Sequence, residues 1–265
     1  MNIYYAMDLL KNTFDGIYLI TCDKTSKERL DSFFESNKIN RDDVQIVLFK
    51  TAKEKFETIY KDDKGINHDE VVGNAHNDVI RIALERNQKR ILVFEDDARL
   101  TNMVPNEKLI KILNWIKNND WDVFYLGHYT MGLQHHINNY IVRTLGSLGA
   151  HAVAYNQKIM KLLLQQKYDI SIDNILRANA INYRMYASKP PVFYQYIAPP
   201  GVQKFRKYIF PSAKLEHWDN QINDLGLSFF YMIIIIPFII ILICIYFNMR
   251  TGRRGAKHRT ALRAN

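Results

Sequence analysis

Up to about residue 195, the chain alternates between short apolar runs and longer segments in which apolar residues recur every three or four positions. The short runs are rich in β-branched and aromatic side chains, which is typical of strands, and the longer segments have the spacing of amphipathic helices. The strand candidates are residues 16–21, 44–49, 90–95, 121–127, 150–155 and 183–187. Because strands alternate with helices, the pattern predicts an α/β domain with a mainly parallel central sheet.

Helices are expected between these strands. The first begins near Thr25 or Ser26, either of which can cap it. The others are expected over residues 69–87, after Pro105 and over residues 156–167. Residues 50–68 and 128–140 are polar and lack a clear period, so both are expected to be loops, the first with a helical turn or two.

Three adjacent carboxylates, Glu95, Asp96 and Asp97, follow directly on the apolar run of residues 91–94. A continuous apolar run predicts a strand buried on both faces, and its carboxyl end lies at the edge where open α/β folds bind ligands. Adjacent negative charges repel one another unless a cation neutralises them, so the cluster indicates a divalent metal. The alternative is a solvated acidic turn after a core strand.

Near the C-terminus, residues 225–247 form an apolar segment without a charged side chain. At about 1.5 Å rise per residue, a helix of this length spans roughly 34 Å, which is enough to cross the hydrocarbon core of a bilayer. We therefore predict a transmembrane helix, which Pro237 can kink. The expected organisation is a catalytic domain over residues 1–200, a connector over 201–224, the span over 225–247 and a basic tail over 248–265.

The formal net charge of +9 is concentrated in this tail. Six of the Lys and Arg residues and none of the acidic residues lie after residue 224, so the first 224 residues carry 30 basic and 27 acidic groups. A nearly neutral domain argues against a general nucleic-acid surface, and we expect no nucleic-acid partner.

Two arguments about orientation conflict. By the positive-inside rule, the basic tail would lie in the cytoplasm and the domain on the other side of the membrane. However, residues 1–14 lack the pattern of a secretory signal peptide, and a lone C-terminal span then leaves the domain in the cytosol. Cys22 and Cys244, the two cysteines, give no sign of an oxidising compartment, so we expect a cytosolic, membrane-anchored domain.

In their order along the chain, several blocks resemble glycosyltransferase family twenty-five, which includes lipooligosaccharide and procollagen galactosyltransferases. The blocks are IYLITCDKTSKERL, GNAHNDVIRIALERNQKRILVFEDDARL, WDVFYLG and GAHAVAYNQKIMKLLL, with Asp173 in SIDNIL similar to the family's late Asp. The resemblance covers residues 16–195. It departs from the family pattern at Asn74 and Ala75, where the family has Cys and Ser, so the donor and acceptor stay open.

The resemblance implies a GT-A-like nucleotide-sugar-binding fold and a role for each acidic residue. Asp97 would be the first metal ligand, for Mn²⁺ or Mg²⁺, and Glu95 a metal or ribose contact. Asp96 would contact the cofactor as well. Asp173 would be the catalytic base that takes the proton of the acceptor hydroxyl, although the same Asp can be a helix N-cap.

Basic and histidine residues complete the candidates. Arg29 fills the family's Arg position and can meet a nucleotide phosphate, or be a surface arginine. His76 is a candidate catalytic residue, or a buried helix histidine. By residue type alone, further candidate metal ligands are His128, His135, His136 and His151.

These observations favour a membrane-anchored glycosyltransferase of glycan biosynthesis, for example of lipopolysaccharide. It would move a hexose, galactose or glucose, from a nucleotide sugar such as a UDP-hexose. The acceptor would be a glycan, a lipid or a protein. Two other classes stay open: a non-catalytic tethered domain of the same fold, and a metal-dependent phosphotransferase or nuclease. Binding of a nucleotide sugar, as opposed to a polynucleotide, distinguishes them.

Overall fold

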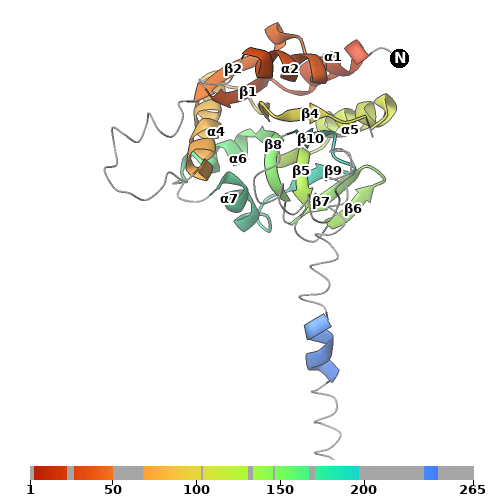
Figure 1. The fold of residues 1–265 in the computed structure, drawn as a ribbon. Helices are drawn as coiled ribbons and strands as arrows, with labels where there is room; N and C mark the ends of the chain where they lie inside the picture. The colour runs from red at the N-terminus through yellow and green to blue at the C-terminus, as the bar shows by residue number, and fades with distance from the viewer. Residues whose placement is uncertain are drawn as a thin grey trace, which may run out of the picture.

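The computed structural model describes residues 3–22, 27–49, 68–102, 104–130, 134–145, 147–166, 171–196 and 236–243. Its main feature is an eight-stranded sheet with helices on both faces (Figure 1). The elements are α1 (Ile3–Thr13), β1 (Gly16–Cys22), α2 (Lys27–Asn37), η1 (Arg41–Asp43), β2 (Gln45–Phe49), α4 (His68–Glu85), β3 (Arg90–Glu95), β4 (Ala98–Leu100), α5 (Asn106–Asn118), β5 (Val123–Thr130), β6 (Gln134–Asn138), β7 (Ile141–Thr144), β8 (Ser147–Asn156), α6 (Gln157–Leu164), α7 (Ile172–Ala178), β9 (Met185–Ser188) and β10 (Phe193–Gln195).

Most strands of the sheet run in one direction. The strand order is β2-β1-β3-β8-β5-β9-β7-β6, and β1 pairs in parallel with both β2 and β3. β8 is antiparallel to its neighbours β3 and β5, and β7 is antiparallel to β9 and β6, while β5 and β9 are parallel. β8 and β7 therefore oppose the other six strands, which confirms the predicted α/β fold with a mainly parallel sheet.

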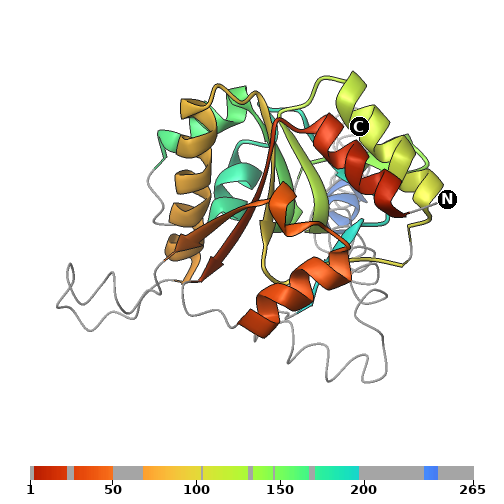
Figure 2. The same cartoon turned by 90° about the horizontal axis from the view of Figure 1, so that it is seen from above.

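The alternation of side chains along each strand builds two apolar cores. On β3, Leu92 and Phe94 pack with α1, α2 and α5, whereas Ile91 and Val93 pack with α4, α6 and α7. Figure 2 shows the two groups of helices on opposite sides of the sheet. Because both faces are covered, the central strands are apolar at nearly every position, which is why the sequence identifies them.

The prediction of a loop over residues 128–140 is wrong. β5 continues to Thr130, and β6 and β7 form an antiparallel pair at the edge of the sheet. β6 has the sequence QHHIN and three of its five side chains are exposed, so it has no apolar alternation and is defined by its pairing with β7. Further elements without a sequence prediction are α1, η1 and the paired short strands β4 and β10.

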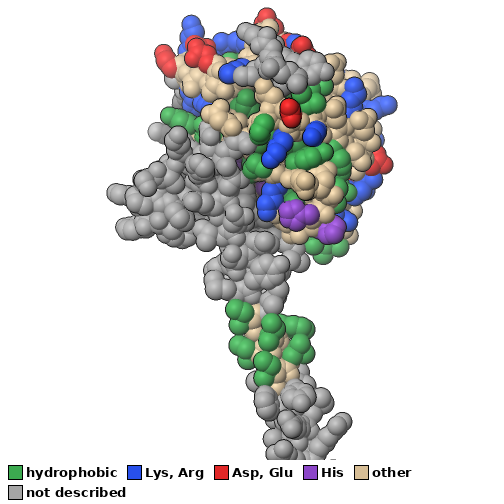
Figure 3. Space-filling view, turned by 90° about the vertical axis from the view of Figure 1, so that its right-hand side faces the viewer, with side chains coloured by type: hydrophobic (Ala, Val, Ile, Leu, Met, Phe, Trp, Pro, Cys, Tyr) green, Lys and Arg blue, Asp and Glu red, His purple; other side chains and the backbone are tan. Residues whose placement is uncertain are grey.

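The predicted transmembrane segment lies mostly outside the described residues. Residues 236–243 are helical, and their apolar side chains are about half exposed all round (Figure 3). Within the described ranges, no helix is long and apolar enough to cross a bilayer. The connector over 201–224 and the tail over 248–265 also lie outside them, as does the predicted loop over 50–68 except for His68, which begins α4.

Candidate functional site

The acidic triplet lies where the carboxyl ends of β1 and β3 meet the first half of β8. Ile20 on β1 pairs with Glu95, and Phe94 pairs with Ala152 on β8. β5 reaches the same edge, because Gly127 also pairs with Ala152. The strand pairing thus gathers residues that are far apart in the sequence around the end of β3, at the edge that the sequence predicts for the site.

Asp96 points toward α2 and is engaged by its neighbours. Its Oδ2 accepts a hydrogen bond of 2.6 Å from the hydroxyl of Thr21, and its Oδ1 forms an ion pair with Arg29. Arg29, which the sequence proposes as a phosphate contact, is therefore joined to the acidic triplet. Asp96 connects the end of β1, the start of α2 and the turn after β3.

Glu95 points to the opposite face of the sheet, toward α4. His76 Nε2 lies 3.9 Å from Glu95 Oε1, and His76 Nδ1 is hydrogen-bonded to the hydroxyl of Tyr155 at 3.1 Å. His76 is completely buried, and burial lowers its pKa to about 4, so the ring is neutral at physiological pH. Burial, together with the charge of Asp96, raises the pKa of Glu95 to about 7.

Asp97 is 8% exposed and is held from β10. Its Oδ2 accepts a hydrogen bond of 3.1 Å from Gln195 Nε2, and its backbone carbonyl accepts one of 2.8 Å from the N–H of Tyr196. Among the described residues, no group forms a hydrogen bond with its buried Oδ1. Burial and the nearby charge of Glu95 raise the pKa of Asp97 to about 8, which means that the ionised pair is unfavourable without a cation.

A buried cation lies close to the triplet. The guanidinium of Arg99 donates hydrogen bonds of 2.9 Å to the carbonyls of Asp96 and Ala98, and it stacks between the rings of Phe33 and Tyr196. These bonds fix the backbone of the turn that carries the carboxylates. Burial lowers the pKa of Arg99, and the charge of Asp97 opposes this shift.

Asp173 lies at the start of α7, close enough for its charge to act on His76 and Tyr125. Its Oδ2 accepts a hydrogen bond of 2.7 Å from the N–H of Gly149 on β8. The alternative role as helix N-cap is wrong, because Ser171 caps α7 with its hydroxyl. The structure thus brings Asp173 and His76, the two predicted catalytic residues, to the side of the triplet where Glu95 points.

The other histidine candidates lie on strands, and the ring centroid of His151 is 5.7 Å from that of Tyr129 at the end of β5. His128 and His151 are buried on β5 and β8, and each ring is hydrogen-bonded to a backbone carbonyl, of Ser188 and Phe193. Burial lowers their pKa values to about 4 and about 3. His135 and His136 are exposed on the edge strand β6.

The side chains at the site can bind a divalent cation whose remaining coordination positions are filled by a bound ligand. Within the described part of the chain, no three His, Cys, Asp or Glu side chains are grouped as a metal site. Mg²⁺, however, commonly binds one or two carboxylates and completes its shell with substrate phosphates and water. Glu95 and the buried Oδ1 of Asp97 match that pattern, because Asp96 is already engaged by Arg29.

Sequence reasoning missed Gln195 and Tyr129, which belong to this site. The hydroxyl of Tyr129 donates a hydrogen bond of 3.2 Å to Gln195 Oε1. β10 is only three residues long and Tyr129 falls in the stretch that the sequence predicts as a loop, so no pattern identifies either residue.

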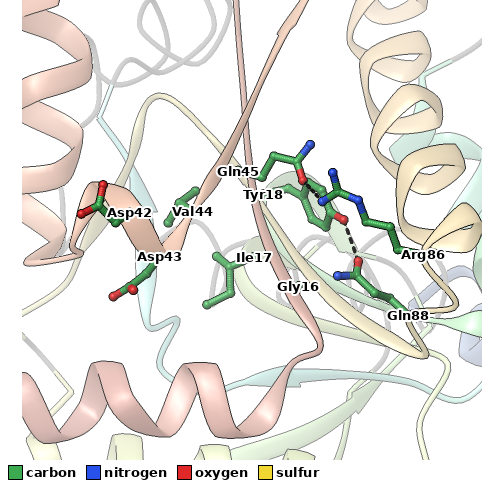
Figure 4. A pocket seen from close by; sticks show the side chains of 9 residues that line it. All are labelled: Gly16, Ile17, Tyr18, Asp42, Asp43, Val44, Gln45, Arg86 and Gln88. Atoms are coloured by element: carbon green, nitrogen blue, oxygen red, sulfur yellow. Dashed lines mark hydrogen bonds between the residues drawn. The ribbon is translucent and has the colours of Figure 1, made fainter.

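Two cavities lie away from the triplet. One, of about 260 Å³, lies between the amino ends of β1 and β2 and the residues after α4, at the opposite edge of the sheet (Figure 4). Its polar side chains bond to one another, since Tyr18 donates to Gln88 at 2.6 Å and Arg86 donates to Gln45. The other, of about 270 Å³, lies between α2, β4 and the start of α5.

No protein-family model and no curated protein matches the chain. Among solved structures, it is similar to UDP-glucose pyrophosphorylase complexed with UDP-glucose, with 10% identity and a TM-score of 0.43 over 85% of this chain and 86% of that one. It is also similar to A197 from STIV, with 12% identity and a TM-score of 0.41 over 69% and 86% of the two chains. A third structure is HddC from Yersinia pseudotuberculosis complexed with GMP-PN, with 12% identity and a TM-score of 0.36 over 71% and 96%. TM-scores below 0.5 do not establish a shared function.

Proposed function

We propose that the protein is a metal-dependent glycosyltransferase of the GT-A type that transfers a hexose from a nucleotide sugar, such as a UDP-hexose, to a glycan, lipid or protein acceptor. One observation carries the proposal: Glu95 and a buried oxygen of Asp97 that lacks a hydrogen bond to any described residue lie together at the carboxyl end of β3. The sequence resemblance to glycosyltransferase family twenty-five supports this class.

In this proposal the two carboxylates would hold a cation, and the cation would in turn bind the nucleotide diphosphate. When bound, Mn²⁺ or Mg²⁺ would neutralise the charge that grows on the diphosphate leaving group. Asp97 Oδ1 and Glu95 would bind the cation. Asp96 and Arg29 would keep the turn in place through their ion pair.

Asp173 would accept the proton of the acceptor hydroxyl, because it comes from another element and its charge acts on His76, which lies beside Glu95. His76 is completely buried and its Nε2 lies 3.9 Å from Glu95 Oε1, so we place it beside Glu95 and keep Asp173 as the base. The apolar segment 225–247 would anchor the protein to a membrane, with the domain in the cytosol.

The test uses the 265-residue chain in detergent with UDP-, GDP- and CMP-sugars. We expect Mn²⁺-dependent release of nucleotide from one donor, abolished by a chelator and reduced about 100-fold or more in Asp97→Ala. Asp120→Ala is the control, because Asp120 is 81% exposed and pairs with Arg184 at the other edge of the sheet. A folded protein that binds no donor would favour the non-catalytic tethered domain, and metal-dependent cleavage of a polynucleotide would favour a nuclease.

A further inference from the structure

The carboxylate of Asp97 is held by side chains from two distant parts of the chain. Gln195 on β10, 98 positions later, donates Nε2 to Asp97 Oδ2 at 3.1 Å. Tyr129 at the end of β5 donates its hydroxyl to Gln195 Oε1 at 3.2 Å. The three residues form one hydrogen-bonded chain.

The donors and acceptors of these three residues give the series of hydrogen bonds a single direction. Once a bound cation keeps Asp97 ionised, its carboxylate only accepts hydrogen bonds, so Gln195 turns its NH₂ group toward Asp97, which is the arrangement in the structure. Its carbonyl oxygen then faces Tyr129, whose hydroxyl donates. Tyr129 is 7% exposed and Asp97 8%, so water competes little with either bond.

The backbone around Asp97 is fixed as well. Gln195 pairs with Ala98 between β10 and β4, and the N–H of Tyr196 donates to the Asp97 carbonyl. With Oδ2 bonded to Gln195, Oδ1 is the carboxylate oxygen that a ligand can use. The rotation of the carboxylate therefore depends on Gln195.

We propose that Gln195 and Tyr129 are positioning residues, which hold Asp97 so that Oδ1 faces the divalent cation at the nucleotide-sugar site; this inference rests on the proposed function. Neither residue touches the cation or the substrate. Residues that orient a metal ligand in this way commonly change metal affinity 10- to 100-fold when they are replaced.

The chain offers a matched control at the other edge of the sheet. Tyr18 donates its hydroxyl to Gln88 at 2.6 Å, which is the same tyrosine-to-glutamine bond in the cavity of Figure 4. Gln88 donates onward to the carbonyl of Asp15, not to a carboxylate. Gln88→Leu therefore removes a comparable bond without touching Asp97.

The experiment measures Mn²⁺ binding to the 265-residue chain in the presence of UDP, by the electron paramagnetic resonance signal of free Mn²⁺, and thermal unfolding without metal. We expect Gln195→Leu to weaken Mn²⁺ binding by about 10- to 100-fold and Gln88→Leu to leave it unchanged, although both lower the melting temperature. Tyr129→Phe should weaken binding by less, because Gln195 keeps its bond to Asp97.

Three results would overturn the inference, and they are distinguishable. Unchanged Mn²⁺ affinity in Gln195→Leu, with normal binding by the parent chain, removes the positioning role and leaves the proposed function standing. Equal weakening in Gln88→Leu assigns the effect to general stability. A parent chain that binds neither Mn²⁺ nor UDP overturns the proposed function and this inference together.

Discussion

Asp96 and Asp97 are neighbours in the chain, yet their carboxylates have opposite surroundings. Asp96 accepts a hydrogen bond from Thr21 and pairs with Arg29. Asp97 is buried beside the charge of Glu95, and its carboxylate accepts a hydrogen bond from the neutral side chain of Gln195. Burial of a carboxylate is stabilising only where charged partners and hydrogen bonds offset its loss of hydration.

This difference predicts opposite effects of the same substitution. Asp96→Asn should lower the free energy of unfolding by about 1–3 kcal/mol, because a charged hydrogen-bonded pair is lost. Asp97→Asn should leave it unchanged or raise it, because a buried charge is removed beside another. Urea denaturation without metal measures both, and equal losses in the two variants would contradict the assigned surroundings.

Gly149 is the glycine that the site requires. Its φ of +81° is unfavourable for other residues, and an added Cβ would lie 3.0 Å from Tyr129 and 3.1 Å from His151. Gly149→Ala should therefore cost about 1–3 kcal/mol of stability, measured by urea denaturation. Gly16 lacks a left-handed φ, and its new Cβ would displace the side-chain amide of Gln88, so Gly16→Ala should cost less; a larger loss there would contradict the argument.

At the residue scale, the sequence identifies the triplet and misses the groups that hold it. Three consecutive carboxylates after an apolar run form a local signal. Gln195, the residue that donates to Asp97, lies 98 positions away on a three-residue strand. The two residues come together only through the pairing of strands, which no local sequence pattern shows. Gly149 is likewise distant in the sequence from the carboxylate that it binds, because its N–H donates to Asp173.

At the scale of elements, a buried network joins the amino end of β5 to β8 and β9. Asp122 is completely buried, and its carboxylate accepts hydrogen bonds from Asn156 Nδ2 at 3.1 Å and from the N–H of Arg184 at 2.8 Å. Lys158 Nζ lies 3.6 Å from it. These groups lie at the edge of the sheet opposite the triplet, so their role is structural.

Removal of Asp122 should therefore destabilise the domain strongly. We expect Asp122→Ala to lower the free energy of unfolding by about 3 kcal/mol, since it leaves buried donors without their acceptor. Asp120→Ala, which breaks the exposed pair of Asp120 with Arg184, should cost under about 1 kcal/mol. Thermal and urea denaturation distinguish the two, and similar losses would show that Asp122 is not a centre of this network.

Elements with a continuous apolar run or a helical spacing are predictable, including the edge strand β2, and short or polar elements are not. The strands β1, β2 and β3 and the helices α4 and α5 follow directly from apolar runs and helical spacing. β6 has a single apolar side chain, Ile137, which is exposed, and it forms a strand through its pairing with β7. β4 and β10 pair with each other over three residues, which is too short for a periodic signal.

At the scale of the whole domain, buried neutral histidines make its stability depend on pH. Burial lowers the pKa of His128 to about 4, whereas an unfolded histidine titrates near 6.5. Between these values the unfolded state binds more protons than the folded state, so the free energy of unfolding falls as the pH drops from 7 to 4.5. His76 and His151 are shifted in the same direction.

We expect His128 alone to account for a loss of about 2 kcal/mol over this range. Urea denaturation at several pH values measures it, and His128→Gln should flatten the pH dependence by that amount. His135→Gln is the control, because His135 is exposed on β6 and its replacement should leave the slope unchanged. Identical slopes for the parent chain and His128→Gln would contradict the prediction.

The overall fold was largely predictable, because alternating strands and helices restrict the arrangements open to a chain of this size. Strand order was not, since the insertion of antiparallel β8 between β3 and β5 depends on long-range pairing. The predicted membrane segment has a strong local signal, yet most of it lies outside the described residues.

β10 also determines when, during synthesis, the site around Asp97 can be completed. Every strand of the main sheet lies before residue 189, whereas Gln195 and Tyr196 come afterwards. Gln195 cannot donate to Asp97 until residue 195 has been synthesised. A nascent chain halted before residue 193 would therefore contain all strands of the main sheet and still lack the groups that orient Asp97.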